Sequence, residues 1–279
     1  MSHPLLTKLR QTVRLSSDEE AAVRLALGHW KVIPTRQDIA REGDRPRNAT
    51  VLLDGLMCRY VVMADGRRQI LSFIVPGDFC DLSAVVEGWM DHAISTLGAC
   101  TVAIIEHEGL DRLIHSSPSI REALWRDTLR EAAIHRAWVS NLGRRSAYER
   151  LAYLFCEIAV RLESVGMKRT SGYDFTATQT DIGDALGLSA VHVNRMLQQL
   201  RYRKLITYGG NTFAIHDWER LAETAGFSAA YLRTEPCEDL QLSIVPADAG
   251  HMSCGGGHGD ARKDNPPIQR ERAPMPPRT

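Results

Sequence analysis

The polar residues of this sequence that are best suited to molecular recognition lie in the segment 189–202. If this segment is a helix, its apolar residues gather on one face at helical spacing, and they are Val193, Met196, Leu197 and Leu200. The opposite face has Arg195 near its centre and carries no acidic residue. Arginine, asparagine and glutamine can form paired hydrogen bonds with guanine or adenine in the major groove of DNA. The segment is therefore a candidate for reading a base sequence.

We divide the candidate DNA-binding residues into two groups. The first lies on the exposed face of the expected helix or on its flanks and comprises Ser189, Ala190, Val191, His192, Asn194, Arg195, Gln198 and Gln199. The second is the basic run Arg201, Arg203 and Lys204, which suits phosphates and so adds affinity without sequence choice. Generic helix pairs share this periodicity, and basic residues often only face solvent, so neither group alone establishes DNA binding.

The neighbouring segments can position these residues as a helix-turn-helix with a wing. Thr178 and Asp181 have the spacing of an N-terminal cap for a first helix. Gly187 suits the turn before the second helix. The run LITYGGNTFAI, residues 205–215, predicts two strands joined by a turn at residues 209–211. First helix, turn, acid-free second helix, basic run and wing follow one another in the order that matches helix-turn-helix docking on DNA.

Residues 29–115 show a different pattern, in which short β-rich runs are divided by turn residues. Asp54-Gly55 and Asp65-Gly66 lie between apolar runs and predict hairpins, because glycine adopts positive φ without steric cost. The run ACTVAIIEH, residues 99–107, predicts one more buried strand. An antiparallel β-roll or barrel follows from these runs.

A long helix is expected after Ser117. Pro118 suits a helix start, and about 25 residues follow without a helix breaker. One stripe of this helix comprises Leu124, Thr128, Ala132, His135, Val139 and Leu142. The stripe favours pairing with the same helix of a second copy, and the alternative is a helix that lies across the roll. Residues 146–166 predict a further helix with an apolar core face that ends at Gly166.

These patterns predict an α+β fold with four parts. Residues 1–116 form an antiparallel β-roll sensor domain with a leading helix, and residues 117–143 form a dimerisation helix. Residues 144–235 form a winged helix-turn-helix domain, and residues 236–279, which are rich in glycine, proline and charge, form a disordered tail.

Composition narrows the class of protein. The formal net charge is zero, so a basic patch must be local if the chain binds nucleic acid. No apolar run approaches the ~20 residues needed to cross a bilayer, and the charged N-terminus lacks the apolar core of a signal peptide. The six cysteines have no C-x-x-C spacing. We therefore expect a cytoplasmic protein with reduced thiols and no membrane partner.

The β-roll, long helix and winged helix-turn-helix, in this order, resemble the Crp/Fnr family of bacterial transcription regulators over roughly residues 15–227. The residues that carry the resemblance are PGDF at 76–79 and LGLSAVHVNRMLQQLRYRKLI at 186–206. The resemblance implies a homodimer formed through the long helix and bound to double-stranded DNA. It also implies half-sites about one helical turn apart, and RNA polymerase as a further partner.

The expected recognition helix departs from the family pattern at its start. Family members commonly carry Arg-Glu after the capping residue and an arginine four residues after that glutamate. Here the cap Ser189 is followed by Ala190-Val191, and only Arg195 matches. Val191 can touch a thymine methyl group instead, and His192 or Asn194 can reach bases or phosphates. We therefore expect a DNA site that differs from the commonest family site.

The sequence lacks the residues on which the two best-known regulatory ligands of the family depend. A cyclic-nucleotide pocket needs glutamate for the ribose and arginine for the phosphate, and the matching positions hold Leu82 and His92-Ala93. An iron–sulfur cluster needs N-terminal cysteines, but the first cysteine is Cys58. We therefore predict neither cAMP nor an iron–sulfur cluster, and no other cofactor.

Other side chains that could bind metal or react are expected to be inert. The three cysteines of the roll are expected to be buried, and they are Cys58, Cys80 and Cys100. His251, Cys254 and His258 have the residue types of a metal site, but they lie in the expected tail, so we predict no metal site.

An alternative function is a small-molecule sensor whose C-terminal domain contacts a protein partner rather than DNA. The acid-free helix face and the basic run favour DNA over a protein partner. An enzyme is not expected, because the sequence lacks G-x-S-x-G, H-E-x-x-H, phosphate-binding loop and dinucleotide-binding motifs, and no catalytic residue is proposed.

Overall fold

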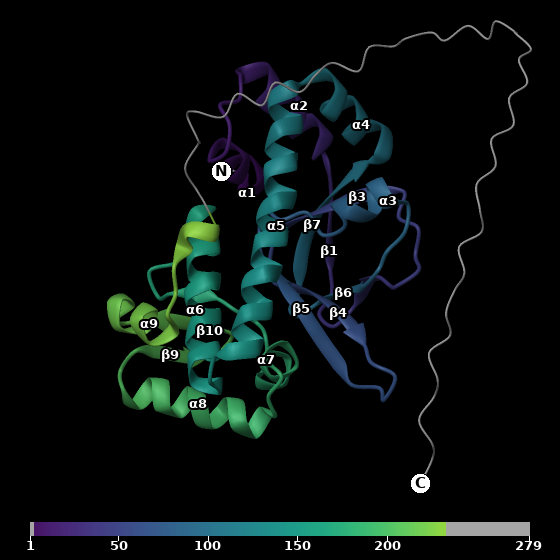
Figure 1. Cartoon of the computed structure of the whole chain (residues 1–279). Coiled ribbons are helices and arrows are strands. Elements are labelled where there is room, and N and C mark those ends of the chain that lie inside the picture. Colours follow the sequence, from purple (N-terminus) through teal and green to yellow (C-terminus); the bar gives the residue numbers. More distant parts are fainter. Residues whose placement is uncertain (1–2, 233–279) are drawn as a thin grey trace, which may run out of the picture. The chain divides into compact units, whose positions relative to one another are not determined.

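The computed structural model describes residues 3–232, apart from the side chain of Ser83 (Figure 1). The expected tail and its His251, Cys254 and His258 lie outside the described residues. Within residues 3–232, no helix has both the length and the apolar character that a membrane span requires. The first part of the chain contains α1 (Pro4–Arg10), α2 (Ser17–Ala26), β1 (His29–Ile33), β2 (Asp38–Ala40), β3 (Asn48–Asp54), β4 (Met57–Val62), β5 (Arg68–Ile74), α3 (Leu82–Glu87), β6 (Ala93–Thr96), β7 (Cys100–Glu106) and α4 (His107–Ser116).

The remaining elements begin with the long helix and end with a short 3-10 turn. They are α5 (Pro118–Arg144), α6 (Ala147–Ser164), β8 (Tyr173–Asp174), α7 (Gln179–Leu186), α8 (Ala190–Tyr202), β9 (Ile206–Gly209), β10 (Thr212–Ile215), α9 (Trp218–Ala225) and η1 (Ala229–Tyr231). The α+β class, the N-terminal β-sheet domain, the long helix and the C-terminal helix-turn-helix are confirmed.

The roll consists of two antiparallel sheets, with strand orders β1-β7-β3 and β2-β6-β4-β5. The hairpin predicted at Asp65-Gly66 is confirmed, because β4 and β5 pair on either side of it. The hairpin predicted at Asp54-Gly55 is wrong. This turn carries the chain from β3 in one sheet to β4 in the other, and Gly55 has φ +98° there. A Cβ at Gly55 would lie 2.7 Å from the carbonyl oxygen of Ala99, so the corner also needs glycine for close packing.

The cysteines of the roll are buried, as expected. Burial raises the pKa of Cys58 to about 12 and that of Cys100 to about 11. Burial also raises the pKa of the Cys80 thiol. All three thiols are therefore protonated at neutral pH and are poor nucleophiles.

Helix α5 begins at Pro118, with the side chain of Ser117 as its cap, and runs beside the roll towards α7 (Figure 1). Its inner residues Ile120, Ala123 and Leu124 pack with strands and helices of the roll. The predicted stripe therefore does not form one open face, since Leu124 is only 6% exposed. Trp125 and Leu129 are open apolar side chains one position further along the helix than Leu124 and Thr128, and Val139 of the predicted stripe is open as well.

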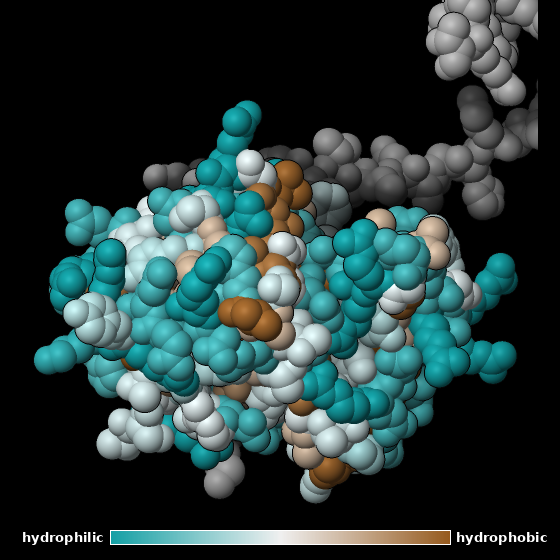
Figure 2. Space-filling model, turned by 90° about the horizontal axis from the view of Figure 1, so that it is seen from below, coloured by the Kyte–Doolittle hydropathy of each residue, from teal (hydrophilic) through white to brown (hydrophobic). Residues whose placement is uncertain are grey.

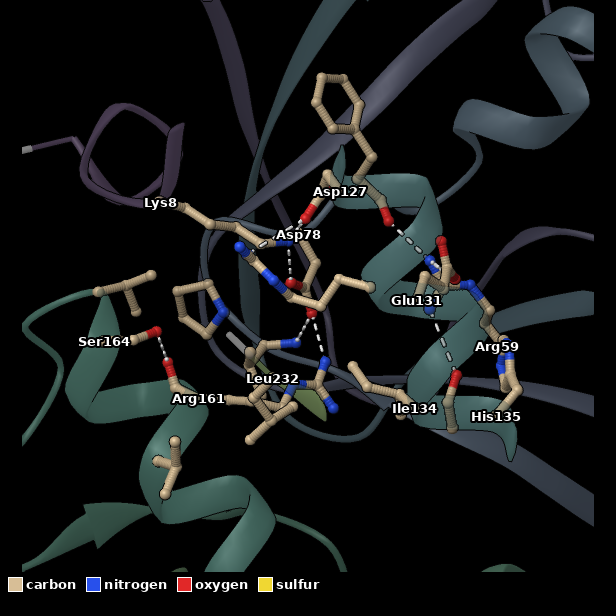
Figure 3. A pocket seen from close by; sticks show the side chains of 17 residues that line it. Lys8, Arg59, Asp78, Asp127, Glu131, Ile134, His135, Arg161, Ser164 and Leu232 are labelled. Atoms are coloured by element: carbon tan, nitrogen blue, oxygen red, sulfur yellow. Dashed lines mark hydrogen bonds and ion pairs between the residues drawn. The ribbon is translucent and has the colours of Figure 1, made fainter. Parts of the chain in front are cut away.

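An ion-pair network joins α1, the roll, α5 and α6. Lys8 Nζ lies 2.7 Å from Asp78 Oδ1 and 2.6 Å from Asp127 Oδ1. Arg161 Nη2 lies 2.6 Å from the other oxygen of Asp78. Figure 3 shows Lys8 and Arg161 reaching Asp78 from two different helices, beside a cavity of about 40 Å³. Because each carboxylate has a cationic partner, the network fixes the roll to the helices without a bare buried charge.

Asp81 is a buried carboxyl whose ionisation opposes folding. Burial raises its pKa from 3.8 to about 6, so this carboxyl contributes stability that is present below about pH 4 and is lost as the pH rises through 6. The side chain accepts a hydrogen bond from Thr50 N at 2.7 Å, which an asparagine oxygen can also accept. We expect Asp81→Asn to be more stable than the wild type by about 2–3 kcal/mol near pH 7.5, with little gain near pH 4.

Urea unfolding of both proteins at the two pH values measures this difference. An equal gain at both pH values would contradict the raised pKa, because only the ionised wild-type carboxyl is costly to bury.

Candidate nucleic-acid interface

The first helix of the helix-turn-helix, α7, has the predicted N-terminal cap. Asp181 N donates to Thr178 Oγ1 at 3.2 Å, and Asp181 Oδ2 accepts from Thr178 N at 2.8 Å. The helix ends at Gly187, whose φ of +65° is a left-handed conformation that favours glycine. The predicted cap and the predicted turn are therefore both present in the structure.

The turn between α7 and α8 depends on two residues that sequence analysis did not identify. A Cβ on Gly183 would lie less than 3.0 Å from the carbonyl oxygen of Leu188, which is backbone and cannot swing away. Arg150 of α6 donates from Nη1 to the carbonyl oxygen of Leu186 at 3.1 Å. The spacing of Gly183 within the motif was visible in the sequence, but its close contact appears only in the folded turn.

Helix α8 has the predicted two faces. Val193, Met196, Leu197 and Leu200 are buried in the core that α8 shares with α6 and α7. Ser189 caps the helix, because its side chain accepts from His192 N at 3.2 Å. The inner face therefore anchors the helix, and the outer face is free to carry recognition residues.

The structure places four polar residues of the first group in solvent. Asn194, Arg195, Gln198 and Gln199 are exposed, and none of these side chains has a hydrogen bond within residues 3–232. Val191 is 81% exposed at the start of the helix, whereas Ala190 and His192 are half-buried. An ordered helix that carries unpaired hydrogen-bonding groups on one face can bind base edges without breaking internal contacts.

The three residues of the basic run have different surroundings in the structure. Arg201 is half-buried and donates from Nη2 to the carbonyl oxygen of Tyr208, so it ties α8 to the wing. The guanidinium of Arg203 lies 5.4 Å from the centre of the Tyr148 ring. Lys204 is exposed, with φ +57°. Arg203 and Lys204 thus leave their charge near solvent, and Arg201 has a structural contact that the sequence did not indicate.

The wing is the hairpin β9–β10, which pairs with β8 in a three-stranded sheet. Its turn is formed by Gly210 and Asn211, both with positive φ, while Gly209 still belongs to β9. Figure 2 views the molecule from the side on which α8 lies, and shows a mostly hydrophilic surface with separate hydrophobic patches. Such a surface suits a polar, charged partner better than an apolar protein interface.

Comparison with known proteins agrees with this geometry. A family model described as a Crp-like helix-turn-helix domain matches residues 149–224, and a model described as a cyclic nucleotide-binding domain matches residues 30–117. Together the two models match more than half of the chain. The chain belongs to the Crp/Fnr family.

The family relatives are regulators of transcription. Transcriptional activator protein FnrL of Cereibacter sphaeroides is 24% identical over 212 residues, which are 75% of this chain and 85% of FnrL. The fumarate and nitrate reduction regulatory protein of Vibrio cholerae is 26% identical over 198 residues, which are 71% of this chain and 79% of that protein. FixK2 from Bradyrhizobium japonicum shares the fold, with a TM-score of 0.64 at 23% identity, and the match covers 72% of this chain and 98% of FixK2. This chain is accordingly a Crp/Fnr-family DNA-binding transcription regulator.

Leu82 and His92-Ala93 occupy the positions at which the family resemblance implies contacts with a cyclic nucleotide. Leu82 is half-buried at the start of α3, and His92 is 8% exposed. Burial lowers the pKa of His92, and its Nε2 has no hydrogen-bond partner within residues 3–232. Arg59 Nη2 instead links the roll to α5, 2.7 Å from Glu131 Oε1. The prediction that neither cAMP nor an iron–sulfur cluster binds stays a prediction.

Proposed function

We propose that this Crp/Fnr protein binds a two-fold-symmetric DNA site as a homodimer, with one copy of α8 in the major groove of each half-site. The observation that carries the proposal is the outer face of α8, where Asn194, Arg195, Gln198 and Gln199 are exposed and unpaired within the described part of the chain. These are side-chain types that form paired hydrogen bonds with guanine or adenine.

We assign the principal base contact to Arg195. Its side chain is exposed on the outer face, one helical turn from Val191, and arginine pairs with guanine O6 and N7. Val191 is positioned to contact a thymine methyl group, with His192 and Asn194 beside it. Lys204 and Arg203 at the end of α8 are assigned to phosphates, as is the wing. Because Ala190-Val191 replaces the Arg-Glu pair common in the family, the site should differ from the commonest family site.

The homodimer is proposed on the open apolar face of α5. Trp125 is 64% exposed, Leu129 55% and Val139 72%, although all three are large apolar side chains. Their spacing keeps them on one side of the helix, in the manner of a coiled-coil seam. An exposed apolar stripe on a helix of 27 residues favours pairing with the same helix of a second copy.

Replacing Leu129 by glutamate should separate the dimer. Two glutamates per dimer would be buried in the seam without partners, so we expect the dissociation constant of the dimer to rise by on the order of 100-fold. Sedimentation equilibrium measures this constant. Val86→Glu is the matched control, since Val86 is 79% exposed on α3, a helix that Figure 1 shows apart from α5. A Leu129→Glu protein that remains dimeric over the same concentrations as the wild type would contradict pairing through this face.

RNA polymerase is the further partner we propose, because relatives such as FnrL are named as transcriptional activators.

Gel-shift assays with genomic DNA fragments at low salt test the DNA-binding step itself. Retarded complexes that disappear as the salt concentration rises support it, since phosphate contacts release counterions. The absence of any complex at low salt would overturn it and would favour a protein partner for the C-terminal domain.

A further inference from the structure

Two arginines of the roll hold the first helix of the helix-turn-helix by its N-terminal end. Arg36 donates from Nη1 and Nη2 to the two carboxylate oxygens of Asp181, each at 2.7 Å. Arg68 contacts the same carboxylate through Nη2, and its Nε lies 2.9 Å from Asp184 Oδ2. We call these four residues the roll–α7 clamp. Both arginines belong to the roll, and both acids belong to α7.

The clamp is built around a buried charge. The side chain of Asp181 is 1% exposed. Burial alone would raise the pKa of Asp181, but hydrogen bonds from Arg36, Thr178 and Arg68 hold it below its usual range. The carboxylate is therefore ionised throughout the physiological range, and the paired fork of Arg36 fixes its direction as well as its charge.

The clamp acts on the part of the protein that carries α8. Asp181 also completes the capping box of α7 with the N-cap residue Thr178, and α7 meets α8 at the close contact of Gly183 with Leu188. A rotation of the roll relative to α7 would break the fork, whereas a rotation of α7 relative to α8 would break the turn. Figure 1 shows α7 beside the end of the roll at which β5 begins. The orientation of α8 is thereby linked to the roll through side chains far apart in sequence.

We propose that Arg36 and Arg68 are positioning residues for DNA binding. Resting on the proposed homodimer and its two-fold site, the clamp holds each α8 at one angle to its roll and to α5, so that both helices of a dimer meet their half-sites together. The arginines touch no DNA in this arrangement. They act by keeping the second half-site at a high effective concentration once the first is bound.

A weakened clamp has a specific signature. The helix α8 itself is intact, so contact with one half-site is unchanged. Simultaneous contact with two half-sites becomes less favourable, because the angle between the helices must be fixed on binding. The selectivity for correctly spaced half-sites should fall for the same reason.

The test uses the full-length protein and three duplexes: the operator recovered by selection from random DNA, the same operator with its half-sites moved apart by about half a helical turn, and one isolated half-site. For Arg68→Ala we expect roughly five- to tenfold weaker binding to the operator, unchanged binding to the half-site within about twofold, and a reduced preference over the lengthened duplex. Asp184→Asn, which leaves no buried unpaired charge, should change binding in the same sense by less. Arg68→Lys should restore part of the loss.

The matched control is Arg67→Ala. Arg67 is the neighbour of Arg68, but its side chain is 84% exposed and pairs with Asp65 inside its own hairpin. Wild-type behaviour of Arg68→Ala on all three duplexes would overturn the clamp, and so would tighter binding or an equal loss on the half-site. A wild-type protein that binds none of the duplexes would instead overturn the proposed function, and the positioning of α8 with it.

Discussion

Replacing Arg195 by alanine is expected to lower the affinity for the selected operator by at least about 30-fold. A paired arginine–guanine contact supplies about 1–3 kcal/mol of discrimination, and a dimer loses two such contacts. The side chain is exposed and has no hydrogen bond within the described residues, so its removal should leave the free energy of unfolding unchanged. Fluorescence anisotropy with the operator duplex at fixed salt concentration measures the loss.

Arg112→Ala provides the control for charge alone, since Arg112 is an exposed arginine on α4, in the roll domain. The Arg195→Ala protein should also discriminate less at the base pair that Arg195 reads, while binding to unrelated DNA changes little. A loss below about threefold, with discrimination intact, would show that another side chain is the principal base reader.

Replacing Gly183 by valine is expected to abolish operator binding by distorting the helix-turn-helix. Even a Cβ at this position would approach the carbonyl oxygen of Leu188 more closely than real Cβ atoms do, and the rest of a valine side chain adds to the conflict. Because the obstacle is backbone, α7 and α8 must move apart, which we expect to cost about 2–4 kcal/mol of stability. Chemical unfolding measures the cost, and anisotropy measures the lost binding.

Gly187→Asn is the matched control in the same turn. Gly187 has φ +65° but has open space where a Cβ would be, and asparagine tolerates this conformation better than other side chains. The Gly187→Asn protein should have nearly the same stability and operator affinity as the wild type. Near wild-type stability of Gly183→Val would show that the turn can relax, and would contradict the close contact as a requirement of the motif.

The helix-turn-helix was predictable from sequence because its determinants are local. The cap formed by Thr178 and Asp181, the turn at Gly187 and the apolar spacing of α8 all lie within a short segment. Each of these is decided by neighbours along the chain, so periodicity and capping rules apply directly.

The features that escaped prediction depend on contacts between distant segments. The turn at Gly55 is a corner because β3 pairs with β7 rather than with β4, and a local glycine signal cannot reveal the partner strand. The predicted stripe of α5 is only partly open, because the roll covers Leu124. The contact of Arg36 with Asp181 joins residues 145 positions apart, and nothing in the sequence around either residue indicates its partner. Local sequence patterns therefore predicted helix α8 but not the long-range contacts that hold the helix-turn-helix against the roll.

Selection of bound duplexes from random DNA by the full-length protein, with the stoichiometry of the selected complex measured by sedimentation, tests most directly whether a homodimer reads a two-fold-symmetric site through α8. We expect an inverted repeat with half-site centres about one helical turn apart, a guanine in each half-site that Arg195→Ala no longer selects, and two chains per duplex. Enrichment of an asymmetric site bound by one chain, or no enrichment over unselected DNA, would contradict it.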